Sequence, residues 1–239
     1  AVIFTPLRMM MPSNSVKAWR RSAPLSPIRS HNLMNFSKVR LKMDIKVQPM
    51  GDYQTNCYIV TINDKDLIID PGVNAFSWIK RNVKNPIAIL NTHGHFDHVL
   101  SNQEIKDNYK IKLYIPKDDE FMLTLDPYNL GMPPSYADIL VNSDEEIEIE
   151  GIKIKFHHFP GHTPGCSAIQ IDKCLFSGDF IFKGTIGRFD FPNSNAKLMK
   201  QSLNKILKWN EDFHIYPGHG DKTTLKSEIQ TLKQWEKHI

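Results

Sequence analysis

Histidine and aspartate side chains gather in four short polar segments, each of which directly follows an apolar run. The densest segment is 92–98 (THGHFDH), which follows the run PIAILN and holds three histidines and one aspartate within six residues. The other three are 161–165 (GHTPG), 177–179 (SGD) and 217–220 (PGHG). Imidazole nitrogens and carboxylate oxygens are ligands of zinc, and they also suit iron and manganese. The sequence therefore predicts a metal centre.

The spacing within these segments predicts two ions. His93 and His95 lie at alternate positions, near enough for one ion when the turn is tight, and Gly94 leaves the backbone free to make that turn. Asp97 and His98 then point onward to a second ion. The candidate ligands are His93, His95, Asp97, His98, His162, Asp179 and His219. They are too many for one tetrahedral ion, whereas two ions about 3.5–4 Å apart that share one carboxylate would use them all.

The elements that must position these ligands are short strands first, and then strands that alternate with helices. The sequence predicts strands over 44–49, 56–62, 66–70, 86–91, 112–115, 146–150, 153–159, 167–171, 174–177 and 213–216. It predicts helices over 75–83, 99–109, 117–125, 196–209 and 224–237. Two series of strands, each followed by helices, indicate two packed sheets with helices outside. Because strand ends in layered α/β folds gather at one edge, the four polar segments can converge there.

The composition excludes several classes of protein. The chain has 239 residues, of which 41% are hydrophobic, and this is enough for a sizeable core. No run approaches 18 consecutive apolar residues, which excludes a transmembrane helix, so we expect no membrane partner. Cys57, Cys166 and Cys174 are too few and too scattered for a disulfide framework, and they form no CxxC zinc pair. We therefore expect a reducing compartment, the cytoplasm.

The net charge of +4 hides an asymmetry along the chain. Residues 1–43 hold eight lysines and arginines and no acidic residue, so 44–239 hold 22 basic and 26 acidic residues, a net charge of −4. This mildly acidic body predicts no nucleic-acid partner. We interpret 1–43 as a basic extension outside the fold. It is an organellar transit peptide, upstream sequence before a start at Met43, or a cloning remnant.

The motifs THGHFDH, PGHTPG, FSGDFIF and YPGHG, in this order and spacing, resemble the metallo-β-lactamase superfamily of metal-dependent hydrolases and their relatives. The resemblance covers about 44–239. It implies an α/β fold, an αββα sandwich of two mixed β-sheets flanked by helices. It also implies two divalent ions, Zn²⁺ in the first place, with Fe or Mn as alternatives. The implied ligands are His93, His95 and His162 for the first ion, Asp97, His98 and His219 for the second, and Asp179 as the bridge.

Within the superfamily, GDFIF followed by GTIGRFDFP resembles the small glyoxalase II group, the hydroxyacylglutathione hydrolases. The resemblance implies hydrolysis of a small thioester such as S-lactoylglutathione by a hydroxide that bridges the ions. Asp97 would be the catalytic residue that orients this hydroxide and takes its proton. Asp179 stands where true β-lactamases carry Cys or Ser. One departure is that 19 residues follow Gly220, whereas full-length glyoxalase II has a helical C-terminal domain that holds glutathione.

Two alternatives remain open from the sequence. One is a promiscuous hydrolase of esters, lactones or β-lactams with the same fold. The other is a mononuclear iron persulfide dioxygenase, since that neighbouring group carries a similar G-R-x-D stretch and uses two His and one Asp as ligands. The sequence predicts a small-molecule substrate in each case and leaves the oligomeric state open.

Candidate substrate contacts lie in two regions. Lys183 and Arg188 could pair with a substrate carboxylate, although Arg188 could instead pair with Asp190. The irregular segment 126–138 (DPYNLGMPPSYAD) carries aromatic and Met side chains that need a packing partner, so we expect a lid over the site. Its candidate contacts are Tyr128, Met132 and Tyr136.

Overall fold

Four layers of helices and sheets position the four polar segments. In this computed structural model, residues 42–126, 129, 131 and 133–239 are described, so 1–41 of the predicted extension lie outside the described residues. Met43, which the predicted division assigns to the extension, is the first residue of β1 (Met43–Met50). No helix in these ranges is long and apolar enough to span a bilayer.

The first sheet of the described chain has the strand order β1-β2-β3-β4-β5-β6. Its other strands are β2 (Thr55–Ile62), β3 (Lys65–Ile69), β4 (Pro86–Leu90), β5 (Lys112–Pro116) and β6 (Ile139–Val141). The first three strands pair antiparallel, and β3 to β6 pair parallel. The carboxyl end of the central strand β4 leads directly into the segment THGHFDH.

The second sheet has the order β14-β13-β10-β9-β8-β7. Its strands are β7 (Glu146–Ile149), β8 (Ile152–His158), β9 (Ser167–Ile171), β10 (Cys174–Gly178), β13 (His214–Pro217) and β14 (Thr223–Thr224). The pair β10 and β13 is parallel and the other pairs are antiparallel. A separate hairpin joins β11 (Ile181–Phe182) to β12 (Thr185–Ile186). Both sheets are therefore mixed, as predicted.

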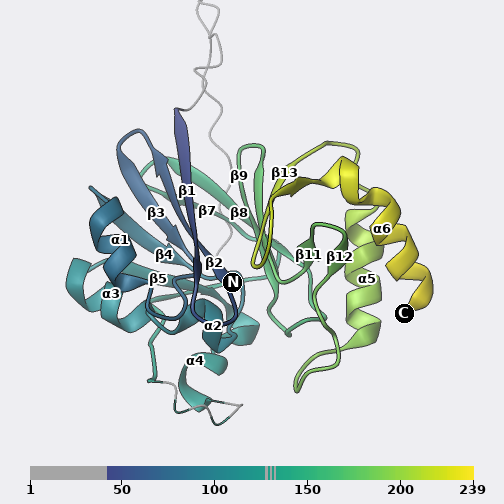
Figure 1. The fold of residues 1–239 in the computed structure, drawn as a ribbon, viewed down its shortest axis with the longest axis horizontal. Coiled ribbons are helices and arrows are strands. Elements are labelled where there is room, and N and C mark those ends of the chain that lie inside the picture. The colour runs from purple at the N-terminus through teal and green to yellow at the C-terminus, as the bar shows by residue number, and fades with distance from the viewer. Residues whose placement is uncertain (1–41, 127–128, 130, 132) are drawn as a thin grey trace, which may run out of the picture. The chain divides into compact units, whose positions relative to one another are not determined.

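Helices cover the outer face of each sheet (Figure 1). On the first sheet lie α1 (Phe76–Asn82), α2 (Phe96–Val99) and α3 (Asn102–Tyr109), and on the second lie α5 (Ala196–Ile206) and α6 (Leu225–His238). Successive residues of a strand point to opposite faces. Val60 and Ile62 of β2 accordingly pack between the sheets, whereas Ile59 packs beneath the helices. This αββα sandwich confirms the predicted fold class.

Some elements differ from the prediction. The strands β6, β11, β12 and β14 were not predicted, because two or three residues are too short for an alternating pattern to show. The helix predicted over 99–109 begins later, as α3 at Asn102, and Val99 instead ends the short helix α2. The chain turns between the two helices at Ser101, whose hydroxyl donates to the Gly72 carbonyl at 2.6 Å. The helix predicted over 117–125 is a 3-10 turn, η1 (Lys117–Asp119), followed by α4 (Met122–Leu125).

The cluster between the two sheets should supply much of the stability. Leu67 of β3 is fully buried there, whereas Leu140 of β6 is 42% exposed. We expect Leu67→Ala to lower the free energy of unfolding by about 2–5 kcal/mol, because it leaves a cavity between packed sheets. Leu140→Ala, the matched control, should cost less than about 0.5 kcal/mol. Urea unfolding followed by circular dichroism measures both, and equal losses would contradict this packing.

Candidate metal centre

The four polar segments meet at one end of the sandwich, although they come from different sheets. THGHFDH follows β4 of the first sheet, and PGHG follows β13 of the second. A backbone hydrogen bond from Asn56 N to the Gly218 carbonyl, 2.7 Å long, joins the start of β2 to this second segment. Thr55 and His219 also form an isolated β-bridge. The two sheets are thus tied together at the end where the ligands lie.

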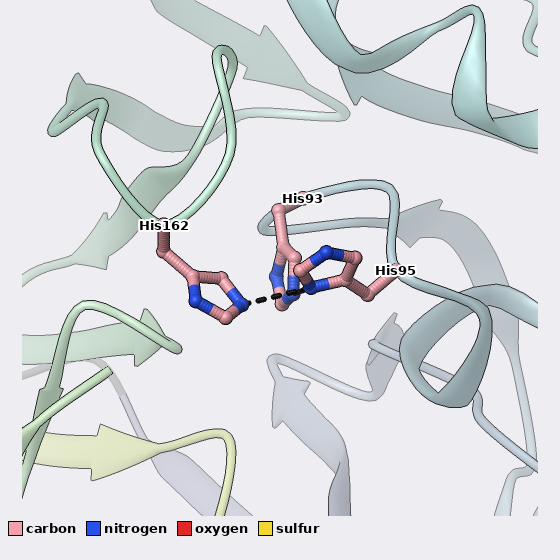
Figure 2. A group of neighbouring side chains, drawn as sticks. All are labelled: His93, His95 and His162. Atoms are coloured by element: carbon pink, nitrogen blue, oxygen red, sulfur yellow. Dashed lines mark hydrogen bonds between the residues drawn. The ribbon is translucent and has the colours of Figure 1, made fainter. Parts of the chain in front are cut away.

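His93, His95 and His162 form one group of facing side chains (Figure 2). Nδ1 of His95 lies 3.1 Å from Nε2 of His93 and 2.8 Å from Nε2 of His162. All three side chains are almost fully buried. Three imidazole nitrogens that face one another at this spacing can donate their lone pairs to one cation.

Asp97, His98 and His219 form a second such group beside the first. Oδ2 of Asp97 lies 3.5 Å from Nε2 of His98 and 3.4 Å from Nε2 of His219. Asp179 lies between the groups, because its Oδ2 is 3.5 Å from Nε2 of His162 and 3.4 Å from Nε2 of His219. The structure therefore brings all seven predicted ligands together, with Asp179 between the two groups.

A fixed hydrogen-bond partner holds the outward ring nitrogen of four of the histidines. These partners are Thr92 Oγ1 for His93 (3.0 Å), Asp70 Oδ2 for His98 (3.0 Å), the Arg188 carbonyl for His162 (2.7 Å) and the Tyr53 carbonyl for His219 (2.9 Å). In each case the outward atom is Nδ1, which leaves Nε2 directed at the centre. Histidines that bind metals are usually oriented in this way.

The charges at the centre favour cation binding. Burial opposes ionisation of Asp97, but His98 and His219 outweigh it and lower the pKa of Asp97 to about 2. Burial likewise opposes ionisation of Asp179, yet His98 and His219 hold its pKa well below the usual range. Burial and the neighbouring imidazoles lower the pKa of His95 to about 3. At neutral pH the carboxylates are therefore ionised, and the His95 ring is neutral.

Two buried atoms test directly whether the centre fits metal ions. Nε2 of His98 and Oδ1 of Asp179 are 3.3 Å apart, and neither makes a hydrogen bond within the described residues. Buried polar atoms nearly always have a partner, so such a pair needs an explanation. A cation accepts electron pairs from both atoms at once. The residues present therefore fit divalent ions.

Asp70 is a buried residue that sequence reasoning missed. Its carboxylate accepts hydrogen bonds from the Thr92 backbone N–H at 2.8 Å and the Thr92 hydroxyl at 2.7 Å, in addition to its contact with His98. These contacts occupy both of its oxygens, so Asp70 orients the His98 ring. The sequence offered one signal for Asp70: it follows the apolar strand β3 and precedes Pro71, and the predicted ligand segments also follow apolar strands.

Asp119, at the end of η1, was also missed, and no sequence motif marks it. Its fully buried carboxylate accepts hydrogen bonds from Gly94 N (3.0 Å), Thr163 Oγ1 (2.6 Å) and Gly165 N (2.5 Å). It thereby joins the loop that carries His93 and His95 to the loop that carries His162. A Cβ at position 94 would lie 2.7 Å from the Met122 Cβ, so glycine is required there by close packing.

A cavity of about 520 Å³ opens beside the centre, and its lining includes His95, Asp97, Asp179 and Arg188. Lys183 lies instead in a neighbouring cavity of about 620 Å³, together with His219.

Of the residues predicted in the lid, Tyr128 and Met132 lie outside the described residues. Tyr136 is 59% exposed, and its backbone carbonyl accepts a hydrogen bond from Lys106 of α3. The substrate contacts named from the sequence therefore stay predictions.

The role of Asp119 can be tested by metal retention. Asp119→Ala leaves three buried donors without an acceptor and frees the two histidine loops, so we expect metal affinity to fall by about 10–100-fold. Asp118→Ala removes the neighbouring exposed carboxylate and should leave the affinity unchanged. Competition with a chromophoric chelator measures both affinities, and an unchanged affinity in Asp119→Ala would contradict the role.

Comparison with known proteins agrees with this geometry. A family model described as the metallo-beta-lactamase superfamily matches residues 50–219. A Haemophilus influenzae protein named hydroxyacylglutathione hydrolase GloC is 34% identical over 201 residues, which cover 78% of this chain and 95% of the relative. This relative supports the resemblance to the glyoxalase II group.

Two solved structures are similar over almost their whole length. BLEG-1, described as a B3 metallo-β-lactamase, superposes with a TM-score of 0.71 at 32% identity and covers 78% of this chain and 97% of its own. TTHA1623, in a di-iron-bound form, gives a TM-score of 0.66 at 29% identity, and the match covers 78% of this chain and 98% of TTHA1623. The chain therefore belongs to the metallo-β-lactamase superfamily, a superfamily of metal-dependent hydrolases.

Proposed function

We propose that residues 44–239 form a dinuclear metallohydrolase that cleaves small thioesters such as S-lactoylglutathione. The observation that carries this proposal is the place of Asp179, whose Oδ2 lies between His162 of the first group and His219 of the second, while its Oδ1 faces His98 of the second. One carboxylate between two groups of ligands is the arrangement that a pair of ions requires. Zn²⁺ is the ion we expect in the first place, since the donor set suits it.

Asp97 is the proton acceptor that this proposal requires. Bound at the centre, two divalent ions would supply Lewis acidity and a water molecule whose pKa is lowered to about 7. The hydroxyl of buried Thr55 donates to Asp97 Oδ2 at 2.6 Å and fixes that carboxylate in place. Asp97 thereby stays ionised and oriented, and it can take the proton that the water loses when the thioester carbonyl is attacked. Thr55 is a further residue that sequence reasoning missed.

Two of the three described cysteines, Cys57 and Cys166, are unsuited to act as nucleophiles. Burial, reinforced by nearby carboxylates, raises the pKa of Cys57 and of Cys166 well above its usual value. Both side chains are fully buried in apolar clusters. A thiol kept protonated within a core attacks no carbonyl, because the thiolate is the nucleophilic form. This agrees with water as the attacking group, as hydrolysis requires.

The relatives support the proposal and one alternative to it. The similarity to a protein named hydroxyacylglutathione hydrolase favours a thioester substrate, and the di-iron form of TTHA1623 favours two ions. The similarity to BLEG-1 is of comparable strength and favours a second candidate, a hydrolase of β-lactams and related esters and lactones. A water activated at such a centre can attack carbonyl groups that carry different leaving groups. The rest of the cavity must therefore decide which of the two candidate substrate classes is preferred.

Metal content tests the centre itself. We expect two divalent ions per chain after reconstitution, measured by inductively coupled plasma mass spectrometry. Asp179→Ala removes the shared ligand, so it should retain at most one ion. Its loss of activity should exceed the about 10–100-fold that substitution of an outer hydrogen-bond partner costs. Asp107→Ala, on the exposed face of α3, is the matched control and should retain both ions. Two ions retained by Asp179→Ala would contradict the bridging role.

The reaction is tested by comparing substrates on the same preparation. We expect kcat/KM for S-lactoylglutathione to exceed the values for a simple ester, a lactone and a penicillin by about tenfold or more, because a thiolate leaves readily once water is activated. His93→Ala should abolish turnover of all four. A preference for the penicillin would favour the second candidate. One iron per chain with oxygen consumed on glutathione persulfide would overturn the hydrolase proposal.

A further inference from the structure

The cavity beside the centre has aromatic walls on both sides. Phe191 lies on one side, with its ring centroid 6.0 Å from the rings of both His95 and His162. Phe182 lies on the other, 5.8 Å from the ring of His219.

Tyr53 and Phe96 extend this second wall. Their rings meet edge to face at 5.2 Å, and Tyr53 is 61% exposed. Phe96, Phe182 and Phe191 are half-buried. Aromatic surface that is partly uncovered beside a reactive centre favours an apolar ligand group.

The cations in the described lining of this cavity and its neighbour are already paired. Arg188 donates two hydrogen bonds to the carboxylate of Asp190, at 2.8 and 2.9 Å, and its guanidinium lies 4.2 Å above the Phe191 ring. Lys183 donates to Asp221 at 3.0 Å. A glutathione thioester carries two carboxylates, and each would have to compete with an aspartate of the protein for its cation.

We propose that the preferred substrates are thioesters whose thiol portion is uncharged and aromatic. This inference rests on the proposed function and deepens it. A substrate carbonyl at the centre has its acyl group on one side and its thiol group on the other. Because both sides have aromatic walls, the thiol portion meets an aromatic ring in either orientation. Hydrolysis adds water across the C–S bond: the acyl carbon gains the oxygen, and the thiol leaves with its sulfur protonated or as the thiolate.

Three lactoyl thioesters test the inference, since they share one acyl group and have alkyl thiols of similar acidity. Their thiols are benzyl mercaptan, N-acetylcysteamine and glutathione. We expect kcat/KM to be at least about tenfold higher for the benzyl than for the glutathione thioester, because burying a phenyl ring is worth that much or more. The neutral N-acetylcysteamine thioester should fall between them. The metal-loaded protein is used throughout.

Substitutions assign the selectivity to the walls. Phe191→Ala and Phe182→Ala should each reduce the preference for the benzyl thioester, mainly through KM, and Phe191→Leu should restore part of it. Phe76→Ala, which removes a half-buried ring on α1, is the matched control and should leave the preference unchanged. Arg188→Ala should not lower kcat/KM for the glutathione thioester selectively, because Arg188 is held by Asp190.

Binding gives a readout that does not depend on turnover. N-benzyl lactamide, an amide that mimics the substrate, should bind by calorimetry with a negative heat-capacity change, the mark of apolar burial. Phe191→Ala should weaken this binding.

The outcomes separate the inference from the function. A glutathione thioester turned over as fast as the benzyl one, or a selective loss for it in Arg188→Ala, would overturn the inference and leave the thioesterase intact. Cleavage of none of the three thioesters by protein that holds two ions would instead overturn the proposed function.

Discussion

Two buried carboxylates within reach of five imidazoles are the constraint on which this structure depends. Asp97 and Asp179 lie almost out of solvent, and ionised carboxylates in such a place need positive charge close by. Within the chain a protonated imidazole supplies that charge. Burial opposes protonation of His219, but hydrogen bonds to Asp179 and Asp97 outweigh it and raise the pKa of His219 to about 9. A divalent cation supplies the same charge and also accepts the lone pairs that face it.

The surrounding fold keeps these groups from moving apart. Four histidines are held at Nδ1 by a carboxylate, a hydroxyl or a backbone carbonyl, so their rings cannot turn toward better-solvated positions. Asp119 then joins two of the ligand loops through three hydrogen bonds. Close packing completes the support, because a Cβ at position 218 would lie 2.1 Å from Asp179 Oδ1. The site is therefore built as much from backbone and outer partners as from ligands.

The sequence predicted the residues that lie in motifs and missed the residues whose role depends on contacts between distant segments. The seven candidate ligands were visible because they cluster in motifs after apolar strands, and the αββα class followed from the order of elements and the resemblance. Thr55 and Asp119 were not visible, because their hydrogen bonds join residues that lie 25 to 46 positions apart in the sequence. Arg188 shows the limit for function: its charge left open a substrate contact or a pair with Asp190, and the structure has the pair with Asp190.

The division of the ligands between the two sheets has a consequence for how the molecule matures. His93, His95, Asp97 and His98 follow β4 of the first sheet, whereas His162, Asp179 and His219 belong to the second half of the sandwich. Neither group of three is complete within one sheet. A nascent chain emerging from the ribosome therefore cannot assemble the whole centre until His219 has been synthesised and the second sheet has docked. Loading of the complete centre with ions is therefore a late event in the maturation of the chain.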